Sequence, residues 1–191
     1  PFRVLEYQGE SHNGWVIPPR WEALTATLAR DGRLVYDGLA HPLGTVPLSP
    51  AFEGRLALEE LRPHLHFHHG DDEAIPFHYR QQFRSWSRAW GFCLPRRLVE
   101  SLAPGAYDVA LRVRESPGVM RVLELTLPGR RTETIVFGAN LDRPGVANDG
   151  PSACAVGIEL MRRLKKRRTK LTYRLVLVPG IIGSEYYLGR M

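Results

Sequence analysis

The sequence predicts an α/β fold in which a sheet with parallel neighbouring strands is joined to a β-rich module. From Gly118 onward an apolar strand, an amphipathic helix and a second apolar strand follow one another, and this succession implies a crossover between parallel strands. Residues 21–113 instead contain short apolar runs separated by turn signals such as Asp31-Gly32 and Asp37-Gly38. We therefore expect three regions, at 1–20, 21–113 and 114–191.

The elements are expected in a simple order. Leucines alternate with polar residues between Leu123 and Leu127, which predicts a strand buried on one face. Apolar residues recur at helical spacing between Ala153 and Leu164. The expected elements are strands at Phe2–Tyr7, Leu123–Leu127, 133–138 and Thr172–Val178, a helix-like segment at Leu56–Leu65, and a helix at 151–166.

The C-terminal sheet is expected to be incomplete. Only about three strands are accounted for there, so one face of the sheet is expected to lack cover and the chain to stop before its fold is complete. Gly183-Ser184-Glu185 is a candidate start of another helix, with Ser184 as its cap. Because residue 1 is a proline, the true N-terminus is expected to be missing, so the lack of a signal pattern in the opening residues says little about a signal peptide.

Composition excludes several classes of protein. The longest nearly uninterrupted apolar stretch, Leu175–Gly183, is too short to cross a bilayer, so no membrane partner is expected. Two cysteines, Cys93 and Cys154, cannot form a disulfide framework or a four-cysteine zinc site, and they favour a reducing, cytoplasmic setting. Both are expected to be core residues rather than nucleophiles.

The positive charge is concentrated in one place. Much of the net charge of +6 comes from the basic run between Arg162 and Lys170. Cations at a helix end oppose the negative end of the helix dipole and keep the surface solvated. No aromatic residue is interleaved with them to stack on bases, so no nucleic-acid partner is expected.

The segment Ala139–Asp149 is the strongest candidate for chemistry. It lies between a predicted strand and a predicted helix, and Pro151 suits the first turn of that helix. Ligands of α/β sheets bind at such carboxyl ends of strands, so Asp149 is a candidate ligand of a cation. The alternative is that Asp149 only caps the free N–H groups of the helix, and the local pattern leaves both open.

Several motifs, taken in order, resemble a known family. They are Gly14-Trp15-Val16-Ile17-Pro18 with Trp21, Leu58-Glu59-Glu60-Leu61, Asp72-Glu73-Ala74-Ile75-Pro76-Phe77, Trp90-Gly91-Phe92-Cys93-Leu94, Gly105-Ala106-Tyr107-Asp108-Val109, the stretch from Asp142 to Asn148-Asp149, and Tyr173-Arg174 through Pro179-Gly180-Ile181-Ile182-Gly183-Ser184. Together they resemble the bacterial aminopeptidase-like proteins, which are often encoded near polysaccharide-biosynthesis functions.

This resemblance implies a zinc-exopeptidase-like mixed sheet flanked by helices and interrupted by an inserted β-rich domain. It implies two zinc ions, with metal-assisted hydrolysis of a peptide or amide bond in a small substrate. By position Asp149 matches the carboxylate that bridges the two ions, and Asp142 matches the acid that orients or supplements the first ligand. No catalytic residue and no oligomeric state is assigned.

Two positions depart from the family pattern. Asn140 stands where the first histidine ligand is expected, and Gly180 stands where many relatives carry a glutamate. The last histidine of the chain is His78, so the C-terminal region supplies no imidazole. The alternative is therefore a catalytically inactive relative that binds a peptide or a sugar.

Two further sets of residues have competing interpretations. His64, His66 and His68 would share one face of an extended segment and could bind a metal ion, which we interpret as adventitious rather than designed binding. Glu159 precedes Arg162 and Arg163 by three and four residues, so it is expected to form surface ion pairs rather than to ligate a metal.

Overall fold

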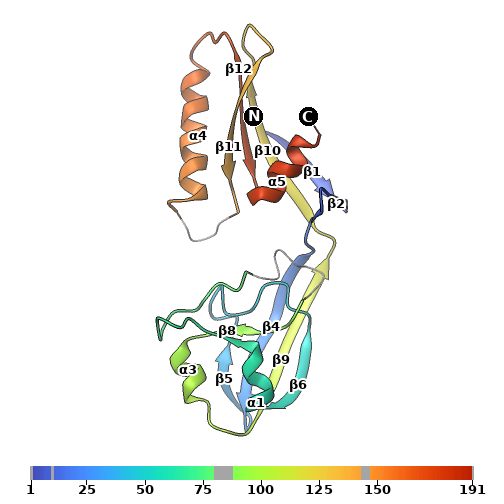
Figure 1. Cartoon of the computed structure of the whole chain (residues 1–191), viewed down its shortest axis with the longest axis vertical. Coiled ribbons are helices and arrows are strands. Elements are labelled where there is room, and N and C mark those ends of the chain that lie inside the picture. Colours follow the sequence, from blue (N-terminus) through green and yellow to red (C-terminus); the bar gives the residue numbers. More distant parts are fainter. Residues whose placement is uncertain (1, 10, 80–87, 143–146, 191) are drawn as a thin grey trace. The chain divides into compact units, whose positions relative to one another are not determined.

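The computed structural model describes residues 2–9, 11–79, 88–142 and 147–190 (Figure 1). The chain forms two compact units: unit 1 is Pro1–Ile17 with Pro117–Met191, and unit 2 is Pro18–Ser116. These limits fall a few residues from the expected boundaries at 20 and 113. None of the helices in the described ranges is long and apolar enough to cross a membrane.

Unit 1 is built on a four-stranded mixed sheet in the order β1-β10-β12-β11. β1 is antiparallel to β10, β10 is antiparallel to β12, and β11 is parallel to β12. Its elements are β1 (Arg3–Gln8), β2 (Ser11–His12), β3 (Trp15–Val16), β10 (Val119–Leu127), β11 (Thr134–Asn140), α4 (Gly150–Leu164), β12 (Thr172–Val178) and α5 (Gly180–Leu188). The mixed sheet with flanking helices confirms the predicted fold class.

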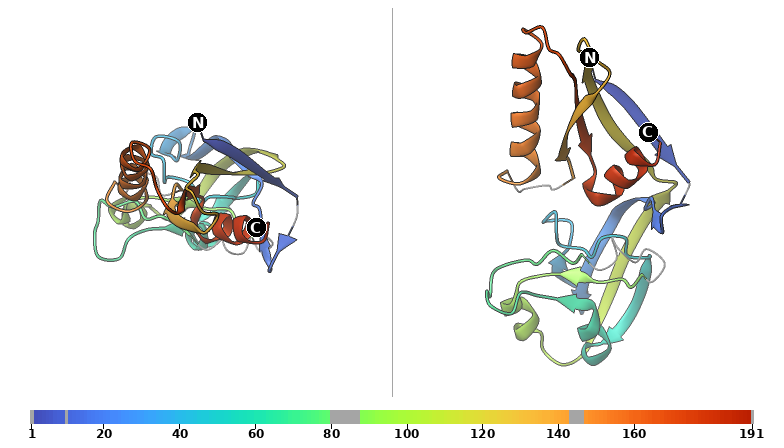
Figure 2. Two further views of the ribbon diagram at one scale, coloured as in Figure 1. Left: turned by 90° about the horizontal axis from the view of Figure 1, so that it is seen from above. Right: turned by 45° about the horizontal axis from the view of Figure 1, so that its top comes forward.

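A helix packs on each face of this sheet. Alternate residues of β12 point to opposite faces. Leu175 and Leu177 pack with Met161 of α4, whereas Val176 and Val178 pack with Tyr186 and Tyr187 of α5. Figure 2 shows α4 running alongside the strands.

The expectation that one face of the sheet would lack cover is therefore only partly confirmed: α5 covers the Val176–Val178 part of that face, whereas Val136 of β11 is 44% exposed. α5 begins at Gly180 with Pro179 as its N-cap, earlier than the start near Ser184 that we expected. The proline ends β12 and the helix turns back at once onto the Val176–Val178 face.

Unit 2 contains an antiparallel sheet in the order β5-β4-β9-β6, and its described residues also form two short helices and one 3-10 helix. Its described elements are β4 (Arg20–Arg30), β5 (Arg33–Asp37), β6 (Phe52–Ala57), α1 (Leu58–Leu61), η1 (Arg62–His64), β7 (Leu65–His66), β8 (Phe92–Cys93), α3 (Arg96–Ser101) and β9 (Ala106–Ser116). The core includes Leu28, Leu61, Phe92, Tyr107 and Leu111, all at most 1% exposed.

The helix-like segment predicted at Leu56–Leu65 is found in part, as α1 and η1. Leu56 and Ala57 instead complete β6, which pairs with β9, and α1 has only four residues. Pro63 has no N–H to donate to a carbonyl one turn earlier, so the α-helix gives way to η1. The strand and the proline therefore limit the helix from both sides.

Candidate functional site

The carboxyl ends of β11 and β12 form the edge at which the predicted metal ligands lie. The two parallel strands end in register, with Asn140 opposite Val178. The backbone N–H of Leu141 then donates to the carbonyl of Val178 over 2.8 Å, which holds the chain leaving β11 against the end of β12. Asp142 follows one residue later and is exposed.

The carboxylate of Asp142 lies against Gly180. A Cβ atom added to Gly180 would come within 2.8 Å of Asp142 Oδ2. Gly180 has φ of +40°, a conformation that also favours glycine. The carboxylate of Asp142 therefore lies at the first residue of α5, in the space that a side chain at position 180 would fill. The positive end of the helix dipole favours a negative charge there.

Asp149 lies at the start of α4, on the same edge. It is the N-cap residue, and within the described part of the chain its side chain makes no capping hydrogen bond to the helix. Its backbone carbonyl accepts from Ser152 Oγ at 2.9 Å and from the N–H of Ala153 at 3.3 Å. The interpretation of Asp149 as a side-chain cap therefore has no support from this geometry.

Gly150 sets the distance between α4 and β11. A Cβ atom at this position would lie 2.5 Å from the carbonyl oxygen of Asn140, so only glycine allows the approach. The thiol of Cys154 donates to the same carbonyl over 3.3 Å. The start of α4, with Asp149, is thus held directly against the last residue of β11.

The donors on this edge do not make a complete metal centre by themselves. Asp142 and Asp149 are two carboxylates, whereas even an open catalytic zinc site has three protein ligands. Across residues 2–9, 11–79, 88–142 and 147–190, no three His, Cys, Asp or Glu side chains are grouped so as to hold a metal ion. Arg143–Val146, which connect the two acids, lie outside the described residues.

Unit 1 contains one imidazole, that of His12, because its N-terminal part precedes unit 2 in the sequence. The expected lack of an imidazole concerned only the C-terminal region. His12 of β2 packs on Tyr186 of α5, with ring centroids 5.4 Å apart. Next to it, Asn13 Nδ2 donates to Glu185 Oε2 over 3.2 Å. No local signal in the sequence connects residues 12 and 186, so only the fold reveals this neighbourhood.

The three alternating histidines do not lie in one extended segment, which the shared face would require. Only Leu65–His66 of this segment is extended. His64 belongs to η1, where its ring stacks on Trp90 with centroids 3.8 Å apart and its Nδ1 lies 2.8 Å from the Trp90 carbonyl. His66 lies beside His78, with ring centroids 4.3 Å apart. The 3-10 turn at Pro63 takes His64 out of the expected alternation.

Both cysteines are core residues, as expected. Cys93 is fully buried, and burial raises the pKa of its thiol to about 11. Cys154 is 6% exposed, and burial likewise raises its thiol pKa, so the start of the helix does not activate it. Neither thiol is poised to act as a nucleophile at neutral pH.

Unit 2 contains a pocket that the sequence did not indicate. Its volume is about 530 Å³, within the range of small-molecule sites. It is lined by Tyr36, Asp37, Ala40, His41, Ile75, Pro95, Arg97, Leu98 and Ser101. The only available signal was the Asp37-Gly38 turn, which we interpreted as structural.

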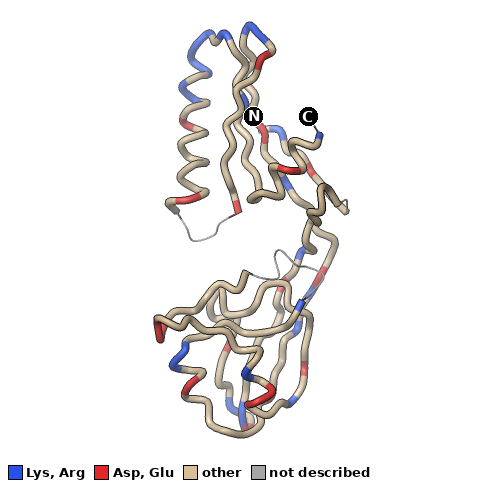
Figure 3. The backbone as a smooth tube through the Cα atoms, in the orientation of Figure 1, with Lys and Arg blue, Asp and Glu red and all other residues tan. Residues whose placement is uncertain are grey.

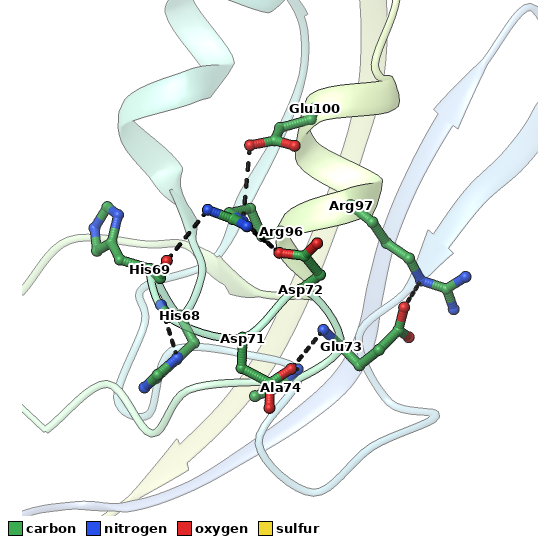
Figure 4. Close-up of polar contacts among 10 residues, drawn as sticks. His68, His69, Asp71, Asp72, Glu73, Ala74, Arg96, Arg97 and Glu100 are labelled. Carbon is green, nitrogen blue, oxygen red and sulfur yellow. Dashed lines mark hydrogen bonds and ion pairs between the residues drawn. The ribbon is translucent and has the colours of Figure 1, made fainter.

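The loop at one wall of this pocket is pinned to α3. Figure 4 shows Arg96 reaching Asp72 and the carbonyl of His69, while Arg97 pairs with Glu73 over 2.7 Å. Asp71 accepts from the N–H groups of Glu73 and Ala74, which lowers the pKa of its carboxyl group. These contacts order the chain that leads to Ile75, one of the lining residues.

Glu159 forms the predicted surface ion pairs, at 2.6 Å to Arg162 and 2.7 Å to Arg163. Hydrogen bonds from both guanidinium groups lower the pKa of Glu159 to about 2. The pairs therefore stabilise α4 at pH values above the ordinary carboxyl pKa, and this contribution is lost as the pH falls through about 2. The acid is not available as a metal ligand.

We expect an NMR titration to place the Glu159 midpoint well below that of an ordinary glutamate. Replacing both partners, in the variant Arg162→Gln/Arg163→Gln, should return the midpoint toward the ordinary value, because the two hydrogen bonds are gone. An unchanged midpoint in the double variant would contradict this assignment.

Comparison with known proteins shows which proteins this chain is similar to. Residues 20–114 match the model of a domain of unknown function, DUF2172. A Clostridium acetobutylicum protein named “Putative polysaccharide biosynthesis protein with aminopeptidase-like domain” is 27% identical over 180 residues, which are 92% of this chain and 40% of that protein. The chain therefore spans about two fifths of the length of this curated relative.

The solved structures to which the chain is similar are also those of peptidases. A crystal structure of a “putative peptidase” from Clostridium acetobutylicum matches with a TM-score of 0.80 and 26% identity, over all of this chain and 44% of that one. BSAP, a zinc aminopeptidase from Bacillus subtilis, matches with a TM-score of 0.69 and 13% identity, over all of this chain and 55% of that one. At 13% identity the latter likeness concerns the fold alone. The chain is similar to bacterial aminopeptidase-like proteins, which confirms the predicted resemblance.

Proposed function

We propose that the protein hydrolyses a peptide or amide bond of a small substrate with the help of zinc, and that Asp149 and Asp142 are metal ligands contributed by this chain. One observation carries the proposal. Both acids lie at the shared carboxyl edge of β11 and β12. Ligands of α/β sheets bind at such an edge, and two carboxylates there suit a cation.

The residues of this chain would do two things at that edge. Asp142 and Asp149 would hold cations, and Gly150 and Gly180 would let both acids approach the strand ends. Bound zinc would supply Lewis acidity toward the substrate carbonyl and toward water. Because the described residues provide only two carboxylates, further ligands are required from elsewhere in the protein, whose relatives are longer than this chain.

The setting we propose is cytoplasmic. The structure holds Cys93 and Cys154 as buried free thiols. Thiols of this kind persist in reducing compartments, whereas proteins of oxidising compartments commonly pair theirs.

Metal content and hydrolysis test the proposal together. The full-length gene product, dialysed against zinc, is expected to hold two equivalents of metal and to hydrolyse an aminoacyl-anilide. Asp149→Asn should lose at least one equivalent and lower kcat/KM by more than about 100-fold, and Asp142→Asn should lower it by about 10–100-fold. Elemental analysis and anilide release measure the two effects.

Glu159→Gln is the matched control, because it removes an exposed carboxylate of the same helix that is already used by two arginines. It should keep both metal content and kcat/KM. A wild-type protein without tightly bound metal would contradict the hydrolase and favour the second candidate.

The second candidate is an inactive relative that binds a peptide or a sugar. The pocket of unit 2 favours it, because apolar residues such as Ile75 and Leu98 are combined there with polar groups such as Asp37 and Arg97. Titration of the metal-free protein with peptides and monosaccharides, followed by amide shifts of the lining residues, would detect such binding. Shifts confined to unit 1 would contradict this location.

A further inference from the structure

Two loops of unit 1 that are far apart in sequence form one strongly basic surface. We call it the basic tip: residues 128–133, between β10 and β11, together with residues 165–171, between α4 and β12. It contains seven cations, which are Arg130, Arg131, Lys165, Lys166, Arg167, Arg168 and Lys170. Figure 3 shows Lys and Arg residues gathered at one end of unit 1, where α4 ends and where β10 connects to β11.

Backbone hydrogen bonds hold the two loops together. The N–H of Arg130 donates to the carbonyl of Thr169 over 3.2 Å, and that of Arg131 donates to the carbonyl of Lys170 over 2.9 Å. Thr172 Oγ1 accepts from the N–H of Gly129 and donates to the carbonyl of Arg131. The surface is therefore ordered before any partner arrives, which lowers the entropic cost of binding.

The approach of the loops also requires a glycine. A Cβ atom on Gly129 would lie 2.2 Å from the carbonyl oxygen of Leu171. The backbone thus brings like charges close together, an arrangement that is unfavourable in the absence of an anion.

The charge of the tip is almost uncompensated. Glu133 is its only acid, and it lies 3.8 Å from Arg131. Among the described residues, the other six cations have no carboxylate within ion-pair distance. The tip thus carries a formal +6, which equals the net charge of the whole chain, so the remaining cations and acids balance.

Stabilisation of the end of α4 does not account for this surface. The cations in the last turn of that helix are Arg162 and Arg163, and Glu159 already pairs with both. Of the seven cations of the tip, Lys165 is the C-cap residue of α4, four follow it in the chain, and two, Arg130 and Arg131, come from a different loop. A solvated helix end would not need them.

We propose that the basic tip binds an anionic phospholipid surface and holds the protein peripherally on a membrane. Exposed cations on two neighbouring loops can contact several phosphate and carboxylate groups of a lipid surface simultaneously. Neither loop contains an aromatic residue that could stack on unpaired bases, which disfavours a single-stranded nucleic acid. No helix enters the tip to read a groove of a duplex, since α4 ends at Leu164.

Vesicle sedimentation tests the proposal with the full-length protein. Vesicles of 70% phosphatidylcholine and 30% phosphatidylserine should bind the protein at 0.1 M salt, and vesicles of phosphatidylcholine alone should not. The variant Lys165→Gln/Lys166→Gln/Arg167→Gln/Arg168→Gln should bind the anionic vesicles at least about 100-fold more weakly, because each basic residue near such a surface raises the affinity several-fold. Salt at 0.5 M should release the wild-type protein.

A matched variant keeps the test specific. Arg20→Gln, Arg33→Gln, Arg55→Gln and Arg62→Gln together remove the same charge from exposed positions of unit 2 and should leave vesicle binding unchanged. Circular dichroism and thermal unfolding verify that both variants fold, and hydrolysis of the anilide should be unaffected. Failure of the wild type to bind anionic vesicles, equal binding by the two variants, or tighter binding to a 20-base-pair duplex than to vesicles would each overturn the proposal.

Discussion

Phe92→Ala is expected to lower the free energy of unfolding of unit 2 by about 3–5 kcal/mol, the range measured when a buried phenylalanine is truncated. Phe92 is fully buried. Its ring lies edge-on to Trp90 and to Tyr36, with centroids 6.3 and 6.2 Å apart. Alanine would remove the ring at the point where β8 meets the core, and a domain of this size has only about 5–15 kcal/mol of stability to lose.

Hydrogen exchange with urea is the appropriate measurement, because a single melting temperature is poorly defined for a chain with two units. Every residue of the core cluster that contains Phe92 belongs to unit 2. Strands β4 and β9 should therefore lose protection, while β10 and β12 retain it. Phe77→Ala, at a site that is 47% exposed, is the matched control and should cost less than about 1 kcal/mol. Equal losses from the two substitutions would refute the placement of Phe92 in the core.

Gly150→Ala is expected to destabilise unit 1 by about 1–3 kcal/mol, the usual cost of forcing a methyl group into filled space. The added Cβ would meet the backbone carbonyl of Asn140 at 2.5 Å, and a backbone atom cannot turn aside as a side chain can. The start of α4 must move away from β11, and Asp149 moves with it. Under the proposed function, zinc affinity should fall together with stability.

Gly138→Ala is the control for this second prediction, because a Cβ atom at Gly138 has nothing within 4 Å. Alanine there should be neutral or slightly stabilising, since it reduces the freedom of the unfolded chain. Thermal unfolding compares the two variants, and exchange over residues 134–164 locates the change. Comparable stability of the two variants would mean that the close approach of α4 and β11 is not required.

Local patterns were sufficient for much of unit 1. The predicted strand Thr172–Val178 is found with the same limits, and the predicted helix at 151–166 differs from α4 by one or two residues at each end. Alternation and helical periodicity are properties of neighbouring residues, so they survive in a sequence read alone. The helix-like segment predicted at Leu56–Leu65 begins two residues later than expected, because pairing with β9, about fifty residues away, extends β6 to Ala57.

The candidate site, too, was predicted from the sequence only in part. Asp142 and Asp149 were identified from the motif between a strand and a helix, and the structure places both at the carboxyl edge of β11 and β12. The proximity of Asp142 to Gly180 had no sequence signal, because nearly forty residues separate them. Whether the two acids ligate zinc stays a prediction.

The amino-acid sequence by itself determined the resemblance to aminopeptidase-like proteins, the strand–helix–strand segment of unit 1, the buried cysteines and the ion pairs of Glu159, because each depends on a motif or on residues within one or two turns. Only the tertiary structure decided that α5 covers part of the second face of the sheet, that His64 stacks on Trp90, and that two loops join into the basic tip. These contacts connect residues far apart in the chain. Their geometry depends on the packing of the whole unit, which no local pattern records.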